Sequence, residues 1–257
     1  MLMQTYEQEL ERLQTEALAL GDMVEKSVVE AIDMLKRRDL AGAQRLISLD
    51  QRINKKRFAI EMDCLTLIVT QQPQENDLRV ITAVLEIVTE LERIGDRTRE
   101  IARTPFMIID GPLVNLLVDI HRMATKTQSM LHRALEAFAR RDLALAQAIP
   151  AEDAEVDALY NGVYRDLLAF IRDNSQARGN SRVLVNQARY LARIARNLER
   201  AADQVSHICG WVAFAVTGEM DGDADATALA SPETDTTLSD SESGKEKSVP
   251  VKQGDPQ

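Results

Sequence analysis

Residues 92–96 of the chain read Glu-Arg-Ile-Gly-Asp, and residues 199–203 read Glu-Arg-Ala-Ala-Asp. Each stretch places two carboxylates four residues apart, with an arginine directly after the first. Four residues make slightly more than one helical turn, so each pair would lie on one face of a helix, roughly 6 Å apart. The recurrence of this motif in both halves indicates that the chain arose by duplication.

The duplication extends well beyond these motifs. The run Arg-Arg-Asp-Leu-Ala at residues 37–41 recurs at residues 140–144, and Asp153 matches Asp50 at the same offset of 103. A longer loop at residues 175–180 raises the offset to 107 for the last helix. We therefore expect an all-α protein of six long helices, arranged as two tandem three-helix repeats at residues 3–105 and 112–219.

Periodicity and breaks predict where the helices lie. Apolar residues alternate at three- and four-residue spacing through residues 3–38, which is typical of a long packed helix. Asp39 is expected to cap the second helix and Pro73 to end it. Asn76 or Asp77 is expected to cap the third helix, which should end near residue 103. The second repeat should hold helices at residues 113–140, up to about 174, and up to about 218.

Composition limits the class of protein. The 257 residues are 45% hydrophobic but only 4% aromatic, with a net charge of −10. The segment 221–257 contains nine acids and three lysines and is poor in large apolar residues, so we expect a disordered acidic tail. A mildly acidic helical body argues against nucleic-acid binding. No run suits a signal peptide or a membrane span, and the two cysteines suit a reducing compartment, so we expect a cytoplasmic protein without membrane insertion.

The acidic motifs are the candidate site. Extending each motif by four residues adds Glu100 after Glu92 and Asp96, and His207 after Glu199 and Asp203. On a helical projection these residues lie away from the buried stripe, so we expect them to face outward. Carboxylate oxygens suit magnesium, manganese, calcium and iron, and an imidazole nitrogen favours transition metals, including zinc. Paired carboxylates at this spacing could therefore hold metal ions, although an ordinary solvated helix face remains an alternative.

No motif supports catalysis directly. The chain has no glycine-rich phosphate loop, no nucleophile elbow and no His-Glu-x-x-His sequence. The Glu-x-x-His pattern of di-iron bundles is also missing, because Ala202 lies three residues after Glu199. A metal-dependent hydrolase or oxidase and a metal-free helical adaptor remain the alternatives to a metal-binding adaptor, and we expect a protein that is not an enzyme.

The run Gln-Gln-Pro at residues 71–73, Asp-Leu-Arg at residues 77–79 and Leu-Glu-Arg-Ile-Gly-Asp at residues 91–96 resembles the PhoU family of phosphate-uptake regulators. The likeness covers about residues 3–219, including the order of the helices and the internal duplication. The second motif is looser, with Ala201 and Ala202 in place of the family's usual Ile-Gly or Ile-Ala.

The resemblance implies a fold of two three-helix repeats, often dimeric, with metal bound at Glu92, Asp96, Glu199 and Asp203. The family usually has asparagine where this chain has Glu100 and His207, which are stronger metal ligands. The implied metals are iron, manganese, magnesium or zinc. The implied role is negative regulation of phosphate uptake and phosphate-starvation signalling, as an adaptor between the ATPase of the phosphate ABC transporter (PstB-like) and a sensor histidine kinase (PhoR-like), with a homodimer as the expected assembly.

Overall fold

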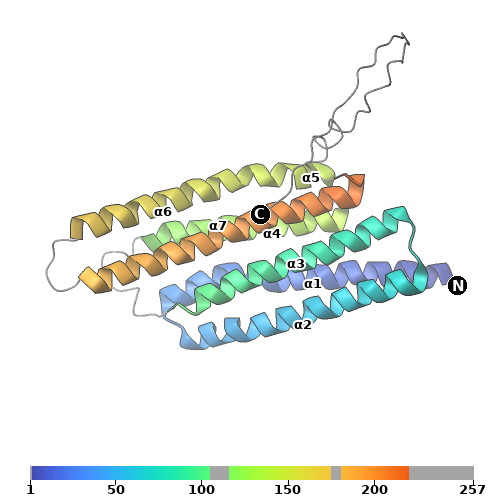
Figure 1. Cartoon of the computed structure of the whole chain (residues 1–257), viewed down its shortest axis with the longest axis horizontal. Helices are drawn as coiled ribbons and strands as arrows, with labels where there is room; N and C mark the ends of the chain where they lie inside the picture. Colours follow the sequence, from blue (N-terminus) through green and yellow to red (C-terminus); the bar gives the residue numbers. More distant parts are fainter. Residues whose placement is uncertain (1, 105–115, 175–180, 220–257) are drawn as a thin grey trace, which may run out of the picture. The chain divides into compact units, whose positions relative to one another are not determined.

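The computed structural model describes residues 2–104, 116–174 and 181–219, and all regular structure in these ranges is helical (Figure 1). The helices are α1 (Leu2–Arg37), α2 (Leu40–Gln71), α3 (Glu75–Ala102), α4 (Leu116–Arg140), α5 (Leu143–Ala148), the 3₁₀ helix η3 (Ile149–Glu152), α6 (Asp153–Asn174) and α7 (Ser181–Thr217). The all-α prediction is confirmed. The predicted acidic tail at residues 221–257 and the loop at residues 175–180 lie outside the described residues.

The turns after α1 and α4 are built in the same way. Arg38 and Arg141 both take left-handed backbone conformations, with φ of 55° and 54°. The next residue caps the following helix: the Asp39 side chain accepts a hydrogen bond from the Gly42 backbone N–H (2.8 Å), and Asp142 accepts one from that of Leu145 (3.0 Å). Such caps contribute about 1 kcal/mol each. The predicted cap at Asp39 is confirmed, and the paired turns agree with the duplication.

Two helix boundaries differ from the prediction. The residue that precedes α3 is Gln74, whose side chain makes no capping hydrogen bond, so Asn76 and Asp77 lie inside the first turn and do not cap the helix. The second repeat divides its counterpart of α2 into α5, η3 and α6. Pro150 lies at the start of η3, where its missing N–H interrupts regular α-helical hydrogen bonding.

The buried core lies between the two repeats as well as within them. Helices α1 and α3 pack against α4 and α7, whereas α2 packs on α1 and α3, and α6 packs on α4 and α7 (Figure 1). The seam expected on the first helix is buried, with Leu13, Leu20 and Leu35 at most 1% exposed. Each such side chain contributes about 1.5–3 kcal/mol. Helices α2 and α6 therefore lie outside the shared core.

Gly95 allows α2 and α3 to approach closely. A Cβ atom placed there would lie 3.1 Å from Cδ1 of Ile53 on α2, closer than ordinary van der Waals contact. Its counterpart in the second repeat, Ala202, is also small and fully buried. The glycine in the motif thus serves packing, which brings the acidic residues of α3 close to the outer helix.

The outer surface of α2 carries an apolar stripe, formed by Phe58, Met62, Leu65 and Val69, whose exposed fractions are 60%, 46%, 50% and 77%. Their spacing places them on one face of the helix. Within the described ranges, no helix is both long enough and apolar enough to cross a membrane.

Candidate metal centre

The four motif acids face the outer helices. Glu92 and Asp96 on α3 are half-buried and lie near Asp50 of α2, whereas Glu199 and Asp203 on α7 are half-buried and lie near α6. The expectation that they face outward from the bundle is wrong for this reason: an outer helix covers the face that the helical projection left free. The two acidic pairs therefore lie in the α2–α3 and α6–α7 interfaces.

The second repeat gathers four carboxylates. Asp153 and Asp157 at the start of α6 lie close to Glu199 and Asp203 on α7. Burial, the negative charges of Asp203 and Asp157, a side-chain hydrogen bond with Asp203 and the charge of Glu199 raise the pKa of Asp153 to about 6. Burial and the charge of Asp203 also raise the pKa of Glu199, and the charges of Arg196 and Arg200 oppose this rise. Like charges at short range destabilise one another, so this cluster has a strong electrostatic demand for a cation.

Some carboxylate oxygens of this cluster also lack hydrogen bonds in the part of the chain that the structure describes. Within the described residues, the buried Asp153 Oδ1 and Glu199 Oε2 atoms have no hydrogen-bond partner. Orphaned carboxylate oxygens suit a hard divalent cation. In the conformation seen, however, no three Asp, Glu, His or Cys side chains of the described ranges are arranged to hold one ion. Metal binding would therefore require these side chains to turn toward one another.

Sequence reasoning missed Asp153 and Asp157 as site residues. Asp153 was recognised only as the repeat of Asp50, and Asp157 was not singled out. The missed signal is the spacing of the motif itself, because these two acids are also four residues apart and lie in the first two turns of α6, which packs against the motif helix α7.

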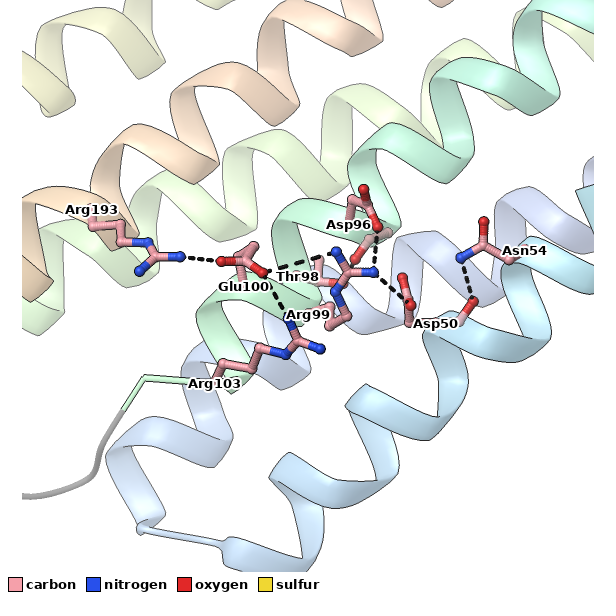
Figure 2. A network of polar contacts seen from close by, with 9 residues as sticks. Asp50, Asn54, Asp96, Thr98, Arg99, Glu100, Arg103 and Arg193 are labelled. Carbon is pink, nitrogen blue, oxygen red and sulfur yellow. Dashed lines mark hydrogen bonds and ion pairs between the residues drawn. The ribbon is translucent and has the colours of Figure 1, made fainter.

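The first repeat holds a different arrangement (Figure 2). The Arg99 Nη1 atom lies 2.8 Å from Asp50 Oδ2 and 2.7 Å from Asp96 Oδ1, so one nitrogen bridges carboxylates from α2 and α3. The Asp50 side chain is 8% exposed and that of Arg99 is 22% exposed. Burial raises the pKa of Asp96 most strongly, and Arg99 opposes this rise. The charge of Arg57 likewise opposes the rise that burial and Asp96 cause in the pKa of Glu92.

Glu100 and His207, the third residues of the predicted stripes, contact other side chains in this conformation. Glu100 forms ion pairs with Arg103 (3.3 Å) and with Arg193 of α7, and a longer one with Arg99 (3.9 Å) (Figure 2). His207 is exposed, and its Nδ1 atom lies 3.8 Å from Glu90 Oε1. The physical reason is rotational drift, because eight residues advance a helix about 80° past two full turns. The third residue of each stripe thus reaches contacts that its acids do not make: Glu100 reaches Arg193, and His207 lies near Glu90.

Glu90 is a third residue that the sequence analysis did not single out. It is 4% exposed, and its Oε1 atom accepts a hydrogen bond from Arg93 at 2.6 Å. It lines a cavity of about 620 Å³, together with Glu86, Gln147, Ser206, His207 and Trp211. No spacing pattern marks Glu90, since the cavity is formed by α3, α5 and α7, which are distant in sequence.

The matches to known proteins cover both repeats of the chain. The family model of the PhoU domain matches the chain twice, at residues 18–104 and 120–212. The phosphate-specific transport system accessory protein PhoU of Serratia marcescens is 33% identical over 220 residues, which cover 84% of this chain and 88% of that protein. The Escherichia coli (strain K12) protein of the same name is 32% identical over 211 residues, covering 82% and 85%.

Solved structures agree with this result. PhoU from Pseudomonas aeruginosa superposes with a TM-score of 0.75 at 30% identity, covering 83% of this chain and all of that one. The phosphate transport system regulatory protein PhoU from Streptococcus pneumoniae gives 0.73 at 26% identity, covering 84% and 98%. The family model matches both repeats, the relatives align over most of their length, and the solved structures have the same fold. This chain therefore belongs to the PhoU family.

Proposed function

We propose that the protein is a negative regulator of phosphate uptake and phosphate-starvation signalling. It would act as an adaptor between the ATPase of a phosphate ABC transporter and a sensor histidine kinase. The observation that carries the proposal is the match of both repeats to proteins named as accessory to phosphate-specific transport. The Streptococcus pneumoniae neighbour is titled a regulatory protein of phosphate transport, which supports the regulatory part.

We further propose that the protein acts by binding and not by catalysis. The names of its relatives describe accessory and regulatory roles, which supports this reading. Its place of action would be the cytoplasm, where the ATPase of an ABC transporter works. Turnover that is lost on metal removal would instead favour the metal-dependent enzyme.

A metal centre in the second repeat forms part of the proposal. Asp153, Asp157, Glu199 and Asp203 would supply oxygen ligands, and iron, manganese, magnesium and zinc are the candidate ions. The support is the surplus of negative charge and the orphaned oxygens of Asp153 and Glu199. A bound cation would neutralise the interface between α6 and α7 and so couple the position of the outer helix to metal occupancy.

We propose a homodimer that buries the apolar stripe of α2. The four side chains of the stripe expose a continuous apolar face, and such faces mark protein contacts. A two-fold contact would pair the stripe with itself. Light scattering coupled to gel filtration should report a dimer for the unaltered protein and a monomer for Phe58→Asp, with Leu40→Asp as an exposed control outside the stripe. A monomer for the unaltered protein would contradict the dimer.

The adaptor proposal is tested by affinity purification of the tagged chain from its own cells, grown with abundant and with scarce phosphate. Mass spectrometry should recover the phosphate transporter ATPase and a sensor kinase, in amounts that change with phosphate. A tagged chain with Phe58→Asp separates contacts that need the stripe from those that do not. Recovery of neither partner under both conditions would contradict the proposed role.

A further inference from the structure

We infer that Arg99 is a built-in cation of the first repeat, so that the first repeat does not hold a metal ion and metal binding is confined to the second. The inference rests on the proposed metal centre for the second repeat. The two halves of the duplication then differ chemically. The acidic interface between α2 and α3 is neutralised by Arg99, whereas the one between α6 and α7 would bind a metal ion.

The geometry of the first repeat supplies the first step. A single nitrogen of Arg99 contacts carboxylates from two helices, Asp50 at 2.8 Å and Asp96 at 2.7 Å (Figure 2). A metal ion that joined α2 to α3 would have to contact these same oxygens. Because a guanidinium is always charged and forms short, charge-assisted contacts, it supplies a permanent positive charge between these carboxylates. The buried Asp50 Oδ1 atom still has no hydrogen-bond partner within the described residues, so Arg99 neutralises the interface without satisfying every oxygen. A metal ion would have to displace a largely buried arginine to enter.

Comparison of the repeats supplies the second step. The offset of 103 pairs Asp50, Asn54 and Arg57 with Asp153, Asp157 and Tyr160. The offset of 107 pairs Glu92, Asp96 and Arg99 with Glu199, Asp203 and Ser206. The first set has a formal charge of −1 and the second of −4. No ion pair in the described part of the chain joins these four carboxylates to a basic side chain, but Arg196 of α7 lies near Glu199 and Tyr160 and offsets part of the negative charge of the second set.

The surroundings of Ser206 supply the third step. Its hydroxyl is buried and lacks a hydrogen-bond partner within the described residues, and the residue lines the cavity of about 620 Å³. The position that Arg99 fills in the first repeat is therefore occupied by a short side chain beside open space in the second. An arginine at residue 206 would have room there, which makes a reciprocal exchange feasible.

The first experiment measures bound Mn²⁺ by equilibrium dialysis and elemental analysis in the unaltered protein and two matched variants. Asp203→Asn should lose most of the bound Mn²⁺, whereas Asp96→Asn, at the equivalent position, should retain all of it. Glu199→Gln and Glu92→Gln form a second matched pair in case one variant fails to fold, as checked by circular dichroism. A loss of metal in Asp96→Asn comparable to that in Asp203→Asn would overturn the inference.

The second experiment exchanges the repeats' side chains. Asn54→Asp, Arg57→Tyr and Arg99→Ser together give the first repeat the residues of the second, and this variant should bind more Mn²⁺ than the unaltered protein. Ser206→Arg should reduce binding as Asp203→Asn does. If only the exchanged variant binds Mn²⁺, the metal centre of the second repeat fails but the role of Arg99 stands. If the exchanged variant gains none, the inference is overturned.

Discussion

Replacing Asp153 with asparagine should stabilise the metal-free protein at neutral pH. The surrounding carboxylates and burial raise the pKa of Asp153 from its ordinary value of 3.8 to about 6. A rise of this size corresponds to about 3 kcal/mol of destabilisation when the group is ionised, and its partial exposure to solvent reduces the expected effect to about 1–2 kcal/mol. Asparagine has a similar shape, keeps a hydrogen-bond donor for Asp203 and carries no charge.

The stabilisation by Asp153→Asn should increase as the pH rises. A carboxyl group whose pKa is raised in the folded state favours folding while the folded protein holds its proton, and that contribution disappears as pH rises from about 4 through about 6. The gain from Asp153→Asn should therefore be fully present at pH 7.5 and nearly absent at pH 4. Urea unfolding followed by circular dichroism, with metal removed by a chelator, measures both values.

The equivalent residue of the first repeat provides the control. Asp50→Asn removes a buried partner of Arg99, and loss of one partner from such a pair costs up to about 3–5 kcal/mol, less here because Asp96 remains. The two substitutions should thus have opposite signs at pH 7.5. Equal destabilisation by both, or a gain from Asp153→Asn that persists at pH 4, would refute the electrostatic reasoning.

Three further outcomes follow from the same contacts. Cys64 and Cys209 are buried, and burial raises the pKa of each thiol to about 12, so a thiol reagent should modify them only when the protein unfolds; rapid labelling of the native protein at pH 8 would contradict this. Gly95→Leu should lower the free energy of unfolding by about 1–3 kcal/mol through overpacking against α2, while Gly95→Ala should change it little, because the gain in helix propensity offsets the tight contact. Glu100→Gln and His207→Asn should leave bound Mn²⁺ unchanged in dialysis, and a loss of metal in either would restore the predicted three-ligand stripes.

Much of the fold could be predicted because local signals repeat. The run at residues 37–41 and its copy fix the same turn and cap in both halves, and the three- and four-residue spacing of apolar residues identifies the buried seams. The interruption at Pro150 could have been expected from its missing N–H, but its consequence, a separate short helix, depends on how the chain packs there.

The contacts around the motif acids could be predicted only in part. Spacing within one helix identified the motif acids but could not show which helix covers them, so it missed Asp153 and the bridge that Arg99 makes to Asp50. It could not show that Arg193, from a helix distant in sequence, forms an ion pair with Glu100. Contacts between helices determine which side chains surround the acids, and the spacing within one helix does not predict those contacts.

The regulatory role can be tested most directly in cells that lack this chain. Expression of phosphate-starvation genes in phosphate-rich medium should rise when the chain is deleted, return to the basal level with the unaltered protein and with Asp96→Asn, and stay high with Asp203→Asn at equal protein abundance. Unchanged expression after deletion would contradict the account.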